Sequence, residues 1–247
     1  MQFRPPLFVT IPLLAIAGAV LVALGVWQIA RWDYKQELAA ERHARTAAAP
    51  LDIHDTTSAP EAGQIDYRRV VLTGRWDHEH TLTVASSYRF GIRGEEAVVP
   101  LLPADGGPAV LVDRGWYPLT ERERVLAGLQ QQAEVRVPGL ARDLSSGTAR
   151  HGESGWSRFD VAAMASAVPV PVAAWGVIEG ELLEQPLITP PPTLPVQGYV
   201  GYEDTVPHLE YALTWFGMAF ALIAVTYFRL LHRRWAQLEN KPATETQ

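Results

Sequence analysis

Cysteine is absent from the 247 residues. The chain therefore has no disulfide, no thiolate-bound zinc or iron–sulfur cluster and no cysteine nucleophile. Basic residues are also few, with 21 lysines and arginines against 27 acidic residues, and the central region contains no basic run. Nucleic-acid binding needs such a positive field and is excluded. Any bound metal must be held by His, Asp, Glu or Met.

Charge is missing from two long apolar stretches, one near each end of the chain. Residues 7–30 form an uncharged run that spans about 36 Å as a helix, enough to cross a bilayer core of about 30 Å. A cleavable signal peptide is the alternative, but the run is too long and no small-residue cleavage site directly follows it. A second apolar run opens at residue 211. The sequence predicts transmembrane helices over 7–30 and 211–231.

The charge distribution orients these two spans. Residues 31–210 carry 16 basic and 25 acidic side chains, a net −9, while the rest of the chain is net positive. The positive-inside rule then places the short tails, 1–6 and 232–247, in the cytoplasm and the central region outside it. No mitochondrial type of leader precedes the first span, so a bacterial inner (plasma) membrane is expected.

The central region resembles a soluble, β-rich domain. Short runs rich in Val, Leu, Thr and aromatic residues alternate with glycine, proline or charged turns, which is typical of an antiparallel sheet or a small barrel. These runs cover residues 67–76, 81–87, 97–102, 109–116, 134–140 and 172–182. The predicted fold class is a membrane protein in which two transmembrane helices flank an α+β, barrel-like extracytoplasmic domain.

Helical and extended segments complete the central region. The first helix is expected to continue through residues 31–49 and to break at Pro50. Shorter helices are predicted over 120–132, with Thr120 and Glu123 as a capping box, and over 160–168. Residues 186–195 contain five prolines and form a stiff extended segment, here named the proline strap.

One candidate site lies at the start of the second span. His208 follows a proline, and Tyr211 and Trp215 lie three and seven residues further on, so the three side chains share one face of a helix. Ala212 and Ala219 are on that face and would let a planar ligand or another helix approach closely. A helix cap or an interfacial aromatic belt is the alternative interpretation of these residues.

The outer end of the first span is expected at the same membrane depth as the start of the second span. Trp27, Gln28 and Arg31 lie there, and Gly18 and Gly25 on the side of Gln28 permit close packing against the second helix. The predicted site therefore combines an imidazole, an amide, a guanidinium and aromatic rings around an apolar slot. A neutral imidazole can bind haem iron, an arginine can pair with a propionate, and the slot suits an isoprenoid tail.

Other polar residues have simpler interpretations. Arg114 ends an apolar strand, and a buried ion pair with Asp113 or another nearby carboxylate explains it better than catalysis. His78 and His80 alternate in a turn or strand and give only a weak signal for a surface metal site.

The chain contains three recognisable motifs, which are LGVWQ at 24–28 with Arg31, VDRGW at 112–116, and HLEYALTWF at 208–216. In this order they resemble the motifs of the Surf1 (Shy1) family of cytochrome c oxidase assembly proteins. The order of anchor, β-rich domain and second anchor covers nearly the whole chain, and Trp156, Phe159 and Asp160 resemble a further family pattern. The family often has Asn at the position of Asp113 in this chain. It also often has Asn residues at the positions of Val206 and Pro207.

The resemblance implies an inner-membrane assembly factor, or chaperone, for a haem-copper terminal oxidase in respiratory chain biogenesis. Transient haem a is the implied cofactor, with His208 as the ligand to the haem iron. The oxidase catalytic subunit, haem a synthase and membrane lipid are the implied partners. A scaffold that never touches haem is the alternative. A membrane-tethered hydrolase is a third hypothesis. It would need a nucleophile and a base, and the sequence has no such pair at a recognisable spacing, so a non-enzymatic role is expected.

Overall fold

The computed structural model describes residues 7–130 and 133–239 and divides the chain into two compact units. The first unit contains the chain up to Ala39 and from Glu203 onward, and the second runs from Ala40 to Tyr202. Of the two predicted tails, residues 1–6 and 240–247 lie outside the described residues.

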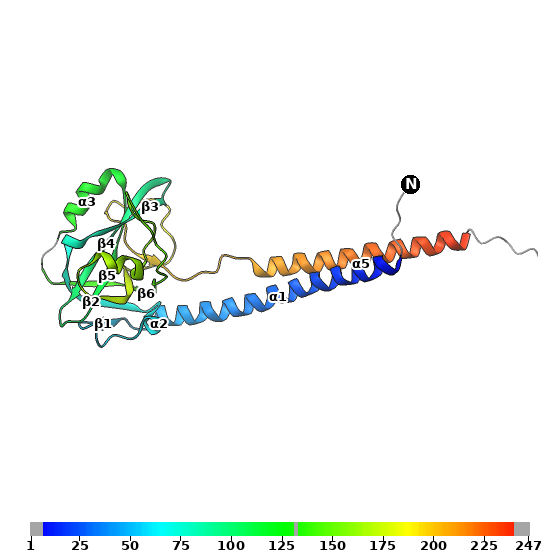
Figure 1. Cartoon of the computed structure of the whole chain (residues 1–247), viewed down its shortest axis with the longest axis horizontal. Helices are drawn as coiled ribbons and strands as arrows, with labels where there is room; N and C mark the ends of the chain where they lie inside the picture. Colours follow the sequence, from blue (N-terminus) through cyan, green and yellow to red (C-terminus); the bar gives the residue numbers. More distant parts are fainter. Residues whose placement is uncertain (1–6, 131–132, 240–247) are drawn as a thin grey trace, which may run out of the picture. The chain divides into compact units, whose positions relative to one another are not determined.

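Two long helices make up the first unit. Helix α1 (Leu7–Ala47) and helix α5 (His208–Glu239) lie side by side and antiparallel over their apolar parts (Figure 1). Both are long and apolar enough to cross a membrane, over Phe8–Ala47 and His208–His232. Helix α1 ends three residues before Pro50, and α5 begins directly after Pro207, whose fixed φ suits the first turn of a helix.

A closed ring of five strands forms the centre of the second unit. Each member is hydrogen-bonded to two others in the ring, and the ring closes where the last strand pairs with the first. In order, the strands are β2 (Arg69–Trp76), β6 (Val135–Arg142), β9 (Val172–Glu179), β5 (Ala109–Pro118) and β4 (Ile92–Pro103). This ring confirms the prediction of a β-rich, barrel-like domain.

One pair in the ring departs from the antiparallel arrangement that the sequence pattern favours. Strands β5 and β9 are parallel, whereas the other four neighbouring pairs are antiparallel. The reason is geometric, because strand direction cannot alternate all the way around a closed ring with an odd number of members. Periodicity within a single strand carries no information about this closure.

The remaining elements extend the sheet or cover it. Strand β1 (Leu51–Ile53) pairs with β2, and strands β3 (Leu82–Arg89), β8 (Gly155–Trp156) and β7 (His151–Gly152) continue the sheet outward from β4. Strands β10 (Leu182–Leu183) and β11 (Tyr199–Val200) form a separate two-stranded sheet. The short helices are α2 (Ala62–Ile65), η1 (His78–His80), η2 (Leu119–Glu121), α3 (Arg122–Gly128), α4 (Val161–Met164) and η3 (Ala165–Ala167). The proline strap contains no regular element.

The predicted capping box at Thr120 and Glu123 is wrong. Thr120 lies inside η2, and α3 begins only after Glu121, whose side chain makes no capping hydrogen bond within the described part of the chain. The preceding 3₁₀ turn supplies the entry into the helix instead, as is common at helix ends.

Apolar side chains fill the interior of the barrel, and a buried ion pair follows them along strand β5. Val110 and Val112 of β5 belong to the buried core, and Arg114 follows two residues later on the same face of the strand. Its Nε donates to Glu179 Oε2 at 2.5 Å, and its guanidinium lies 4.0 Å from the centre of the Trp76 ring. The predicted buried ion pair is therefore confirmed, with Glu179 rather than the neighbouring Asp113 as the carboxylate.

The last turns of α1, which belong to the second unit, pack on the barrel. The guanidinium of Arg42 contacts the rings of both Tyr67 and Tyr202, at 4.5 and 4.2 Å from their centres. Thr46 Oγ1 donates to the Tyr67 carbonyl at 3.2 Å. These contacts join the two ends of the unit, because Tyr202 is its last residue.

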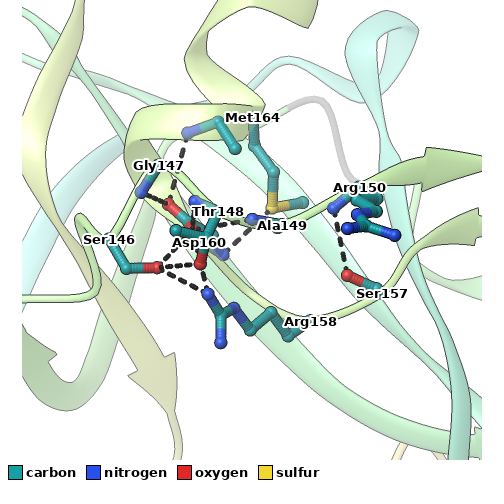
Figure 2. Close-up of polar contacts among 10 residues, drawn as sticks. Ser146, Gly147, Thr148, Ala149, Arg150, Ser157, Arg158, Asp160 and Met164 are labelled. Atoms are coloured by element: carbon teal, nitrogen blue, oxygen red, sulfur yellow. Dashed lines mark hydrogen bonds and ion pairs between the residues drawn. The ribbon is translucent and has the colours of Figure 1, made fainter.

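A buried carboxylate organises the loop between β6 and β7 (Figure 2). Asp160, fully buried, precedes α4 and accepts hydrogen bonds from Ser146 Oγ at 2.6 Å and from the backbone N–H groups of Gly147, Thr148 and Ala149 at 2.9 to 3.1 Å. It also caps α4 by accepting from the N–H of Ala163. Burial alone would raise the pKa of Asp160, but these hydrogen bonds outweigh it and lower the pKa.

We expect Asp160→Asn to lower the free energy of unfolding by about 3 kcal/mol near neutral pH, because the amide NH₂ would face N–H donors. The folded pKa of Asp160 is depressed, so its stabilisation is present above the ordinary pKa of about 4 and is lost as the pH falls below that value. The difference between wild type and variant should therefore shrink in acid.

Denaturant unfolding of the full chain, followed by tryptophan fluorescence between neutral pH and about pH 3, measures this difference. Asp143→Asn, an exposed substitution in the same loop, is the matched control and should change little. Equal stability of Asp160→Asn and Asp143→Asn would contradict the assignment.

Candidate functional site

Small residues bring α1 and α5 into close contact. Gly25 is buried against Phe216, so closely that a side chain at position 25 would overlap the Phe216 ring. Two turns nearer the N-terminus of α1, Gly18 faces Leu222. On α5, Ala212 and Ala219 are buried. The predicted close approach of the two helices is thus present, and the approaching partner of the alanine face is the other helix.

Gln28 and His208 meet at one end of this contact. Gln28 Oε1 lies 2.8 Å from His208 Nδ1, across 180 residues of sequence. A carbonyl oxygen can only accept, so Nδ1 carries the proton and donates. In a neutral ring this leaves the lone pair on Nε2. The hydrogen bond therefore fixes both the tautomer and the orientation of the imidazole.

The other ring nitrogen of His208 is buried without a hydrogen bond. The residue is 7% exposed, and among the described residues Nε2 has no hydrogen-bond partner. Asp204 Oδ2 is the nearest ionic group, at 3.6 Å, which is too long for a hydrogen bond. A buried polar atom without a partner is costly, and a ligand atom bound to it removes that cost.

Asp204 and Lys35 were not assigned to this site by sequence reasoning. Lys35 Nζ lies 3.8 Å from Asp204 Oδ2, so a cation from α1 and a carboxylate before α5 stand next to the imidazole. The available signal was the spacing of four residues between Asp204 and His208, which places the two side chains close together. The contribution of Lys35 depends on the antiparallel pairing of α1 with α5.

The other predicted site residues are more exposed than His208. Trp27, Arg31 and Tyr211 are exposed, and Trp215 is half-buried. The Arg31 guanidinium lies 5.2 Å from the centre of the Tyr34 ring. The structure therefore brings His208 and Gln28 together, and leaves Trp27, Arg31 and Tyr211 accessible from outside the helix pair.

An apolar groove of about 770 Å³ lies between the same two helices. Leu14, Gly18, Val22, Leu222 and Tyr227 are among the residues that line it. Along α1 the lining residue nearest to Gln28 is Ala23, and the Gly25–Phe216 contact lies between Ala23 and Gln28.

The described residues contain no group of three or more His, Cys, Asp or Glu side chains that could hold a metal ion. His78 and His80 lie in η1, where the His80 Nδ1 is 2.7 Å from Asp77 Oδ2. The site chemistry is therefore that of a single imidazole, oriented by an amide and flanked by an ion pair. Such a site can supply one axial nitrogen ligand to a metal whose other ligands come from elsewhere.

Comparison with known proteins gives consistent matches over most of the chain. The model of the SURF1 family matches residues 15–220. A SURF1-like protein of Monosiga brevicollis is 29% identical over 229 residues, which cover 85% of this chain and 83% of the relative. Surfeit locus protein 1 of Xenopus tropicalis is 25% identical, covering 85% and 72% of the two chains. The cytochrome oxidase assembly protein SHY1 of Saccharomyces cerevisiae is 29% identical over 56% of this chain and 36% of its own length.

We expect Gly25→Leu to separate α1 from α5 and to lower the stability of the helix pair by about 1–3 kcal/mol, because the new side chain overlaps Phe216. The glycine at position 217 of α5 is the matched control, since a Cβ there meets no described atom within 4 Å. Unfolding of the full chain in mixed detergent micelles measures both. Equal losses of stability for Gly25→Leu and Gly217→Leu would show that the Gly25–Phe216 contact does not determine how α1 packs on α5.

Proposed function

Because the chain belongs to the SURF1 family, we propose that it acts as an assembly factor for cytochrome oxidase. The family match confirms the resemblance drawn from the three sequence motifs. The assembly role is inferred from the yeast relative, which is a cytochrome oxidase assembly protein. On this proposal the protein is a non-enzymatic chaperone whose partners include the catalytic subunit of the oxidase.

The specific task proposed for the site is to carry haem a to that subunit. His208 Nε2 is the ligand to the haem iron, and the hydrogen bond from Nδ1 to Gln28 orients the ring, as second-shell acceptors do for histidine ligands. The observation that carries this proposal is the buried Nε2 atom without a hydrogen-bond partner among the described residues. Haem is the cargo of this site and supplies the iron.

The other predicted site residues have defined roles in the same proposal. Trp27, Tyr211 and Trp215 offer flat apolar surfaces to a macrocycle, and Arg31 offers a guanidinium to a propionate. The groove between α1 and α5 suits the isoprenoid tail, because its lining is almost wholly apolar. A single imidazole ligand without covalent attachment is compatible with release of the cargo to the oxidase.

The proposed location is a bacterial cell membrane. The two apolar helices span it, both termini are cytoplasmic and the barrel unit is extracytoplasmic, which agrees with the net −9 charge of residues 31–210. Haem a synthase is the proposed donor of the cargo, and membrane lipid surrounds the helix pair.

A scaffold that holds oxidase assembly intermediates without binding haem is the second candidate. The observation in its favour is the packing of the helix pair, because His208 is 7% exposed and Ala212 lies buried on the same face. In this role the Gln28–His208 hydrogen bond would only hold the two helices together.

We expect the full chain, co-expressed with a haem a synthase, to be purified with stoichiometric haem a that His208→Ala loses. Gln28→Ala should weaken haem a binding by about tenfold or more, because the imidazole loses its orienting acceptor. The visible absorption spectrum at matched protein concentration measures both effects.

His232→Ala, at the far end of α5, is the matched control and should keep the haem. A colourless wild type, together with normal oxidase levels in cells that carry His208→Ala, would refute haem carriage and favour the scaffold. Haem retained by His208→Ala would assign the ligand to another residue.

A further inference from the structure

The barrel unit contains a cavity of about 620 Å³ that the proposed function does not use. Strands β3, β4, β5, β6 and β9 contribute to its walls, and so do the proline strap and the residues that follow it. Leu144, Phe159 and Leu183 also line the cavity. A volume of this size holds a drug-sized molecule. Leu140, Ile178 and Leu187 are among its apolar lining residues.

Two arginines line the cavity. Arg89 Nη2 donates to Glu96 Oε1 at 3.1 Å, and Arg142 Nε donates to Asp66 Oδ1 at 3.2 Å. A guanidinium has five N–H donors in a planar fork, so one such bond leaves donors for a second acceptor. Guanidinium groups in a partly apolar wall are suited to bind a carboxylate.

A buried acid lies in the same wall. Asp113 is a lining residue, and its Oδ1 accepts from the Gly115 N–H at 2.9 Å. Burial raises the pKa of Asp113, and the negative charges of Glu96 and Glu179 raise it further, against the hydrogen bond from Gly115 and the charge of Arg89. The protonated form that this favours is a hydrogen-bond donor and does not repel an anion.

A strained residue marks the edge of the cavity. Phe90 has φ +55° in the two-residue turn between β3 and β4, beside Gly91 at φ +73°. Asn, Asp or Gly is usual at the first such position, and a bulky residue there costs about 1 kcal/mol or more. The Phe90 ring contacts Trp116 edge to face, with 5.6 Å between ring centres, and lines the cavity. Strain that places an aromatic ring at a cavity is a pointer to ligand binding.

We propose that this cavity binds an amphipathic organic carboxylate, with the carboxylate at Arg89 or Arg142 and the apolar body along the sheet and the proline strap. A fatty acid and a porphyrin with propionate groups share this chemistry. The proposal does not rest on haem carriage at His208, because all the residues that form the cavity belong to the barrel unit.

The test uses the full chain in lipid nanodiscs and a ten-carbon carboxylic acid with a terminal diazirine as the probe. After photolysis, mass spectrometry locates the labelled peptides, so binding to the bilayer does not obscure the result. We expect labels on residues 183–200, displaced about tenfold more effectively by decanoate than by decanol, which lacks the charge.

Two neighbouring strap residues give a matched pair of variants. Leu187 lines the cavity and is 41% exposed, whereas Ile188 is 88% exposed and is not a lining residue. Leu187→Glu adds a negative charge and should reduce labelling about tenfold, while Ile188→Glu should leave it unchanged. Combining Arg89→Gln with Arg142→Gln should remove the preference for decanoate over decanol, and Arg93→Gln on the strand next to β3 should keep it.

Equal displacement by decanoate and decanol, equal labelling of the two strap variants, or labels only outside the cavity would overturn the proposal. Tryptophan fluorescence of each variant establishes that the barrel unit is folded. Competition by protoporphyrin IX distinguishes a porphyrin site from a fatty-acid site. Stronger displacement by protoporphyrin than by decanoate identifies a porphyrin site, and the reverse order identifies a fatty-acid site.

Discussion

The contact of α1 with α5 at Gly25 is the constraint on which the candidate site depends. Because Gly25 has no side chain, Phe216 packs directly on the backbone of α1, and Gln28 then lies within hydrogen-bond distance of His208. That hydrogen bond holds the proton on Nδ1, and in a neutral ring the buried Nε2 then carries the lone pair. The absence of a side chain at Gly25 therefore allows Gln28, three residues further along α1, to orient the His208 imidazole.

The barrel unit depends on different interactions, each of which satisfies a buried charge. Arg114 pairs with Glu179 across the parallel strands β5 and β9, under the Trp76 ring. Asp160 collects N–H and O–H donors from a loop that has no regular structure of its own. Such groups stabilise a fold only when all their partners are present, so they also specify which loop packs where.

The sequence predicted features that depend on local pattern. The apolar run at 7–30 lies within α1, and the run at 67–76 corresponds to β2. The features it missed depend on closure and on distant partners. The parallel pair of β5 and β9, the choice of Glu179 as the partner of Arg114, and the position of Lys35 beside Asp204 all join residues far apart in the chain. The capping box at Thr120 failed because the 3₁₀ turn η2 displaced the start of α3.

We propose that His208 Nε2 supplies the ligand to the iron of haem a. Chemical rescue of His208→Gly, in which imidazole is supplied from solution, tests this role. We expect the purified variant to lack the haem a absorption band and to regain it when imidazole is added, whereas His232→Gly should retain the band throughout. A His208→Gly protein that binds haem a as wild type does without imidazole would show that His208 is not the ligand.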